Sequence, residues 1–180
     1  AIRPGRRLPP GDFDIIEIDL SRSRKMPPDF WKLLPACQRL RRLNLHGTPT
    51  TDGDIAALRD LTSLRSLDLS ATSITDRATI TIPWLRNLEE LDLSENVIAN
   101  ISLLRLAAMP RLRSLALRKI SLSPYALPLL GSCRSLRVLD LRGVAVAPSA
   151  IEKFRQQVPD CRILLDDGKR PGRDSPLSRP

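Results

Sequence analysis

The stretch LRSLDLSATSITD at residues 64–76 contains the pattern that decides the fold. Its first six letters follow LxxLxL, where x is any residue, and this pattern recurs at a constant interval along the chain. The clear copies open at Leu40, Leu64, Leu88, Leu112 and Leu136. A looser copy starts at Ile15, and Ile163 and Leu165 keep the spacing of a last one. A fixed period of 24 residues indicates a solenoid. We therefore expect one domain of about seven repeats over residues 13–167.

One part of each repeat has the period of a strand. The last two leucines of LxxLxL alternate with a single residue, so both point to the same side of an extended chain. We therefore predict a stack of short parallel strands with nearly buried leucines. Their expected centres are Ile18–Leu20, Leu43–Leu45, Leu67–Leu69, Leu91–Leu93, Leu115–Leu117, Leu139–Leu141 and Ile163–Leu165.

The other part of each repeat has apolar residues in steps of three, which places them on one face of a helical or 3-10 turn. These columns are Trp31, Ile55, Thr79, Leu103, Leu127 and Ile151; Leu34, Leu58, Ile82, Leu106, Leu130 and Phe154; and Cys37, Leu61, Leu85, Met109 and Cys133. Asp52, Asp76 and Asn100 are expected to cap the starts of these helices, and Pro124 and Pro148 to stand in first turns. Pro83 and Pro128 predict short or irregular helices, because proline removes a backbone donor.

A polar column lies eight residues after each first leucine. Its members are Ser23, Thr48, Thr72 and Asn96, followed by Ile120 and Val144. We expect the polar side chains to bond to the turning backbone of neighbouring coils, and packing to replace those bonds in the last two repeats. A further apolar column, which includes Ile74 and Ile98, follows two residues later.

The three cysteines favour free thiols in a reducing compartment. Cys37, Cys133 and Cys161 form no CxxC pair, and their odd number argues against a disulfide framework or a zinc site. Cys37 and Cys133 replace leucines in a core column four repeats apart, at roughly 4.8 Å per strand too far to bridge. With His46 as the single histidine, we expect no metal and no cofactor.

The net charge of +9 is concentrated at the two ends of the chain. Residues 1–12 hold three arginines against one aspartate, and residues 168–180 hold four cations against Asp174. Their Pro, Gly, Arg and Ser content offers little apolar surface to offset the entropy of ordering. We expect a flexible linker at 1–12 and a disordered basic tail at 168–180.

These motifs resemble the leucine-rich-repeat family, and LDLSATSITD at 67–76 is similar to the 24-residue repeats of bacterial members. The resemblance covers about 155 residues and implies a right-handed α/β solenoid, or horseshoe, with a parallel sheet on the concave side and short helices on the convex side. It also implies protein recognition, in some bacterial relatives as part of a larger signalling protein. RATITIP at 77–83 departs from the usual helical stretch, which puts that helix in doubt.

No catalytic arrangement is found, so we predict that the chain is not an enzyme. Asp19, Asp68, Asp92 and Asp140 share one column, but they are typical of a solvated strand surface, and no P-loop, dinucleotide-binding or nucleophile-elbow motif occurs. The sequence pI near 10.5 allows an alternative, nucleic-acid binding through the tails, but aromatic stacking residues are almost missing. A structural spacer without a specific ligand is the other alternative. There is no apolar stretch typical of a membrane span or secretory signal, and we expect a cytoplasmic monomer.

Strand alternation predicts the binding surface. The residues between the leucines should face outward on the concave side, where acidic side chains from residue 89 onward would lie beside basic ones from residue 113 onward. The candidate partner-binding residues are Arg42, His46, Asp68, Glu90, Asp92, Arg118, Lys119, Asp140 and Arg142. We expect an unidentified protein partner, with a modest, salt-sensitive interaction centred on Arg118 and Arg142.

Overall fold

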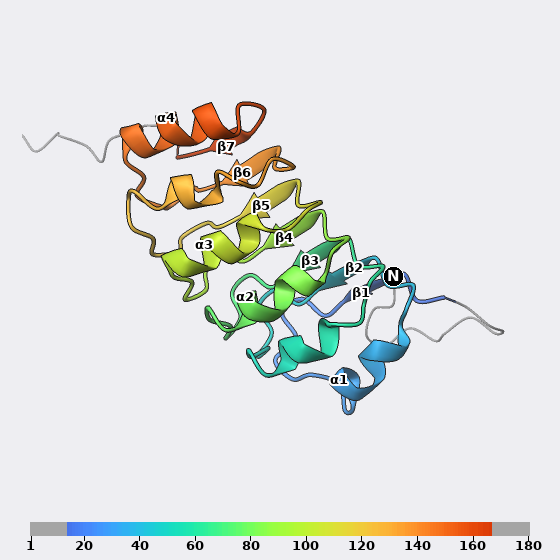
Figure 1. Cartoon of the computed structure of the whole chain (residues 1–180). Helices are drawn as coiled ribbons and strands as arrows, with labels where there is room; N and C mark the ends of the chain where they lie inside the picture. The colour runs from blue at the N-terminus through green and yellow to red at the C-terminus, as the bar shows by residue number, and fades with distance from the viewer. Residues whose placement is uncertain (1–13, 167–180) are drawn as a thin grey trace, which may run out of the picture.

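The computed structural model describes residues 14–166, which form a stack of coils with one strand each. The expected linker at 1–12 and tail at 168–180 lie outside the described residues. The strands form one parallel sheet in sequence order (Figure 1). They are β1 (Glu17–Asp19), β2 (Arg42–Asn44), β3 (Ser66–Asp68), β4 (Glu90–Asp92), β5 (Ser114–Ala116), β6 (Val138–Asp140) and β7 (Arg162–Leu164).

The register of the sheet follows the repeat. Leu67 pairs with Leu91 and Leu91 with Leu115, so paired residues in the sheet are one full repeat apart. Between β1 and β2 the offset is one residue longer, because Ile18 pairs with Leu43. Each strand is centred one residue earlier than predicted, although hydrogen bonding continues beyond it: the Leu45 N–H donates to the Asp68 carbonyl at 2.9 Å.

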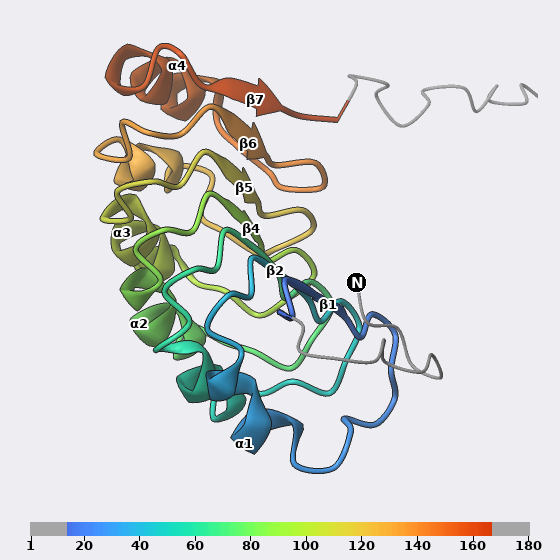
Figure 2. The ribbon, with the colours of Figure 1, turned by 90° about the vertical axis from the view of Figure 1, so that its right-hand side faces the viewer.

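Helical segments cover the side of the molecule opposite the strands (Figure 2). They are α1 (Phe30–Leu33), η1 (Leu34–Ala36), η2 (Asp54–Leu58), α2 (Ala78–Thr81), η3 (Ile82–Trp84), α3 (Asn100–Ala107), η4 (Leu127–Leu130) and α4 (Pro148–Gln157), where η denotes a 3-10 helix. The proline prediction is confirmed: α2 ends after four residues and passes into η3 with Pro83, and Pro128 lies in the first turn of η4. Helix α3, which has no proline, is eight residues long.

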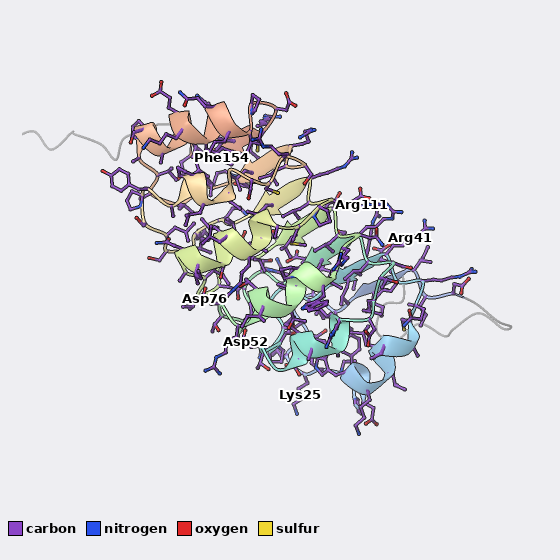
Figure 3. All side chains as sticks on the ribbon, viewed as in Figure 1. Lys25, Arg41, Asp52, Asp76, Arg111 and Phe154 are labelled. Carbon is purple, nitrogen blue, oxygen red and sulfur yellow. The ribbon has the colours of Figure 1, made fainter. Side chains whose placement is uncertain are left out.

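The core lies between the strands and the helical segments and is almost entirely aliphatic. All the residues of the three helix columns from Ile55 to Leu130 are buried, and so is Phe154 of α4 in the last coil (Figure 3). Burial weakens at both ends of the stack. Ile18 and Ile163 are only partly buried and Leu165 is 37% exposed, because a terminal coil has a neighbour on one side only.

The polar column is confirmed in part. The Asn96 Nδ2 group donates to the Leu69 carbonyl of the preceding coil at 2.8 Å, and to the Leu93 carbonyl of its own coil at 3.1 Å. The hydroxyls of Thr48 and Thr72 instead donate to carbonyls of their own turns. The Thr72 hydroxyl also contacts the next coil, since it lies 3.1 Å from Asn96 Oδ1. Ile120 is buried, as expected for packing in place of these bonds.

The cap prediction for Asp52, Asp76 and Asn100 is wrong in one respect: these side chains bond to the next coil. The Asp52 Oδ1 atom accepts the N–H groups of Thr75 at 2.8 Å and Ala78 at 3.1 Å. Asp76 and Asn100 similarly accept N–H groups from the coil that follows theirs. Figure 3 shows Asp52 and Asp76 along one edge of the stack. The stacking brings the next coil's orphan N–H groups closer than those of the residue's own helix.

A left-handed turn follows every strand from β1 to β6 at one repeated position. Gly47 and Gly143 occupy it with φ of 64° and 76°, but Arg22, Ala71, Glu95 and Lys119 do so as well. From Arg22 to Lys119, each of these N–H groups donates to a carbonyl of the following coil. The Gly143 N–H bonds instead to the Asp166 carboxylate at 2.8 Å. The carboxylate therefore supplies the acceptor that a following coil provides elsewhere.

The cysteines are free thiols, as predicted: Cys133 and Cys161 are buried and Cys37 is partly buried. Burial raises the pKa of all three, and that of Cys161 to about 11. They therefore behave as small core residues.

Candidate functional site

The outward residues of the strands form a continuous surface, which we call the strand face. Its larger hollow, of about 530 Å³, lies beyond the carboxyl ends of the strands. Five of the nine predicted residues line it, together with four that were not predicted: His46, Asp68, Arg118, Lys119 and Arg142, with Ser70, Glu95, Gly143 and Asp166.

The strands themselves explain why polar groups gather at this edge. Asp19, Asn44, Asp68, Asp92 and Asp140 each accept the N–H of the residue two positions later, which ends the strand in a side-chain turn. In β5 this position is Ala116, which offers no acceptor. There the Arg118 N–H bonds to the Ser94 Oγ atom of the preceding coil at 3.0 Å. The aspartate column therefore has a structural role in turn formation.

Arg118 connects three coils across the strand face. Its Nη2 atom lies 2.7 Å from Asp92 Oδ2, and its Nε atom lies 3.2 Å from Ser94 Oγ and 3.9 Å from Asp140 Oδ2. The side chain is still 40% exposed. Arg118 is thus oriented by its own chain while part of its guanidinium surface faces the hollow.

Arg142 and Asp140 form a close ion pair on the strand face. The Arg142 Nη2 atom lies 2.6 Å from Asp140 Oδ2, and Nε lies 3.0 Å from Oδ1. Hydrogen bonding to Arg142 lowers the pKa of Asp140, against the opposing effect of its burial. Asp140 is therefore ionised at neutral pH and, together with Asp92, balances the charge of Arg118 and Arg142.

His46 is linked to Asp68 through a serine that sequence reasoning missed. The His46 Nδ1 atom lies 2.8 Å from Ser70 Oγ, and the Ser70 hydroxyl donates to Asp68 Oδ1 at 2.5 Å. The His46 Nδ1–H is then the donor to Ser70. Because Ser70 donates to the carboxylate and not to the histidine, this is not the arrangement of an activated nucleophile.

A second hollow, of about 380 Å³, lies at the opposite ends of the strands. Arg42 and Glu90 line it, so the nine predicted residues do not converge on one site. Arg65 and Glu89, which also line this hollow, form an ion pair. Asp92 and Asp140 line neither hollow, because their carboxylates are engaged with Arg118 and Arg142.

The predicted contact between acidic and basic side chains is present, but it is satisfied within the chain. Arg118 pairs with Asp92, and Lys119 pairs with Glu95 at 3.2 Å. The strand face is therefore a network of matched charges. The repeat itself contains the signal that could have located Ser70 and Ser94: both stand two residues after the aspartate column, as Arg118 and Arg142 do in later coils.

Among residues 14–166, no group of three or more histidine, cysteine, aspartate or glutamate side chains is arranged to hold a metal ion. None of the helices there has the length and apolar character needed to cross a bilayer.

The leucine-rich-repeat family model matches residues 62–119. No curated protein sequence matches the chain. Among solved structures, a leucine-rich-repeat protein of Leptospira interrogans is 23% identical with a TM-score of 0.59 over 82% of this chain and 36% of its own. This chain thus spans little more than a third of that relative's length. Internalin C2 of Listeria monocytogenes is 19% identical with a TM-score of 0.60, over 86% of this chain and 74% of its own.

The repeats of the sequence and the arrangement of the strands agree. The in-register parallel strands, one in each coil, are the arrangement that the repeats predict. Residues 62–119 thus match the leucine-rich-repeat family model, and the described residues form a leucine-rich-repeat solenoid.

Proposed function

We propose that this chain is a non-catalytic protein-interaction module that binds a protein partner through the strand face. The observation that carries the proposal is the hollow of about 530 Å³, where Arg118, Lys119 and Arg142 are oriented by carboxylates of their own chain. Leucine-rich-repeat domains generally serve as interaction modules. Side chains that are already held in place lose less entropy on binding than free ones.

The matched charges indicate what this surface contributes. Arginine is planar and can bond a partner's carboxylate in two places while it keeps part of its own network. Charge patterns of this kind contribute more to partner selection and association rate than to affinity. Within the hollow, the charges of Arg118, Lys119 and Arg142 are balanced by Asp92, Glu95 and Asp140, which favours a partner with both signs of charge.

The wider setting belongs to the same proposal. We place the module in the cytoplasm, because its three cysteines are unpaired and cytosolic thiols stay reduced. We further propose that it acts as a monomer over residues 13–167 and is one part of a larger bacterial signalling protein.

The experiment compares the wild-type chain with Arg118→Gln/Arg142→Gln. Glutamine is chosen because glutamate would stand against Asp92 and Asp140 and disturb the fold. Proteins captured from the source cells are identified, and affinities of purified candidates are measured at low and high salt. We expect the double variant to lose roughly tenfold or more in affinity and the wild-type interaction to weaken with salt.

A control variant, Arg155→Gln, removes an exposed charge from α4 on the helical side and should bind normally. Circular dichroism confirms that all variants are folded. Equal affinity of the wild-type chain and the double variant would show that the strand face is not the binding surface.

A further inference from the structure

Helix α3 is apolar on both of its sides. Leu103 and Leu106 point inward and are completely buried, whereas Ile101 and Leu104 on the outer side are 47% and 49% exposed. A surface helix ordinarily presents polar residues to solvent, and one that is apolar all round is ordinarily covered. Within α3 only Arg105 carries a charge. The outer side of this helix therefore has the composition of a covered surface.

The exposed apolar surface extends into the coils on both sides of α3, which contacts α2 and η4. Ile80 and Leu104 are one repeat apart, as are Ile101 and Tyr125, so each pair occupies the same position in adjacent coils. Trp84 follows Ile80 by one helical turn. We call the exposed residues Ile80, Trp84, Ile101, Leu104 and Tyr125 the helix-face patch. Beyond these three coils the position of Leu104 is taken by Ala56 and Glu152, so the patch has defined limits.

The charges of the three coils that carry the patch are almost all of one sign. The helical segments 76–87, 100–111 and 124–135 together hold five arginines, no lysine and one carboxylate, Asp76. Asp76 is engaged, because its Oδ1 atom accepts the Ala99 N–H at 2.6 Å and the Ser102 hydroxyl at 2.7 Å. The guanidinium of Arg59, from the preceding coil, lies 4.7 Å from the centre of the Trp84 ring. The three coils that carry the patch are thus net positive, and the preceding coil adds Arg59 together with one exposed carboxylate, Asp60.

The charge of the residues around the patch distinguishes between its possible binding partners. A second copy in a two-fold arrangement would bring these arginines against one another, which is unfavourable. Arginine, tryptophan and tyrosine are enriched at protein interfaces, where lysine is depleted. We propose that the helix-face patch binds an apolar protein segment, most simply a short amphipathic helix, that carries aspartate or glutamate beside its apolar stripe. This second surface is independent of the strand face.

The test uses a display library of short helical peptides with randomised surface positions, selected on the wild-type chain. Enriched peptides are synthesised, and their affinity is measured by fluorescence anisotropy against wild type, Leu104→Ser and Leu33→Ser. Leu33 is the matched control, since it is a leucine of α1 that is 65% exposed and lies outside the patch. We expect an apolar stripe flanked by acidic residues, and a roughly tenfold or greater loss of affinity with Leu104→Ser only.

Several outcomes would overturn the proposal. The proposal is wrong if the enriched peptides carry no acidic flanks. It is also wrong if they bind Leu104→Ser and the wild-type chain with equal affinity. Self-association that Leu104→Ser abolishes would identify a second copy as the occupant. Binding to vesicles rich in phosphatidylglycerol, abolished by the same change and without acidic peptides in the selection, would identify a membrane surface. Because Arg118→Gln/Arg142→Gln should bind the selected peptides normally, failure here is separate from failure of the strand-face proposal.

Discussion

At the scale of single residues, the turn after each strand imposes a conformation that most side chains avoid. Ala71, Glu95 and Lys119 adopt positive φ there, in positions equivalent to those of Gly47 and Gly143. The left-handed region costs an L-residue roughly 1–2 kcal/mol. The backbone bond to the next coil, such as the Ala71 N–H to the Ser94 carbonyl at 2.9 Å, holds the turn in place. Inter-coil hydrogen bonding therefore outweighs the local preference.

The first prediction separates this conformational cost from crowding. Gly47→Ala should lower the free energy of unfolding by about 1–2 kcal/mol, because an alanine there must adopt a φ near 64°. Space is sufficient, since an added Cβ would lie 3.8 Å from the nearest atom, of Arg22. Gly53→Ala is the control: its φ is −64°, and stability should stay the same or rise by up to about 1 kcal/mol. Urea unfolding measures both, and equal effects would contradict the explanation.

The thiols give a second residue-scale prediction. Because thiolates are the reactive form and burial raises the pKa of Cys161 to about 11, Cys133 and Cys161 should resist alkylation at pH 8. Cys37, which is only partly buried, should react first. The free energy of unfolding should fall as pH rises from about 9 to about 11, since the unfolded chain releases the Cys161 proton earlier. Timed alkylation with mass spectrometry checks the order; rapid labelling of Cys161 in the folded chain would refute it.

At the scale of elements, α2 and α3 are each held partly by the coil before them. The Asp52 carboxylate accepts the Ala78 N–H at the start of α2, and Asp76 accepts the Ala99 N–H just before α3. A short helix has little stability of its own, so these bonds and the buried leucines support it from outside. Proline then decides the length, as α2 and η3 show by comparison with α3.

The prediction at this scale concerns the carboxylate that joins two elements. Asp76→Ala should lower the free energy of unfolding by about 1–3 kcal/mol, because the Ala99 N–H and the buried Ser102 hydroxyl lose their acceptor. Asp60→Ala, at an exposed position after η2, should change it by less than about 0.5 kcal/mol. Denaturant unfolding measures both variants. If Asp76→Ala lowers the free energy of unfolding no more than Asp60→Ala does, the Asp76 carboxylate does not stabilise the contact between the two coils.

At the scale of the whole molecule, stability depends on how many neighbours a coil has. A central coil packs on two others, whereas the first and last pack on one, and burial decreases accordingly from Leu91 to Leu165. Solenoid stability is approximately a sum of repeat and nearest-neighbour contributions. The ends of the stack should therefore open before the centre.

A pair of matched substitutions tests this. Leu91→Ala should cost about 2–5 kcal/mol, because Leu91 is 2% exposed and the cavity has packed coils on both sides. Leu165→Ala should cost distinctly less, since that side chain is 37% exposed in the last coil. Chemical denaturation followed by circular dichroism gives both values. Similar costs would show that the terminal coil is as tightly coupled as the central one.

The sequence by itself determined the repeat, the parallel strands and the core columns. The reason is that one leucine pattern repeated at a constant interval allows only one stacking phase, so Leu67 must meet Leu91. It also identified the outward residues, because strand alternation is local. Five of them, including His46 and Arg118, do line one hollow.

Only the tertiary structure determined which hydrogen-bond partner each polar group has. Asp52 bonds to the next coil and not to its own helix, Ser94 supplies the acceptor that Ala116 lacks, and Arg42 lies in a different hollow from Arg142. A polar side chain has several donors and acceptors within a few ångströms once coils stack, and small differences in distance select among them. The burial of leucine needs only the right side of the chain, whereas a hydrogen bond also needs a particular atom at about 3 Å.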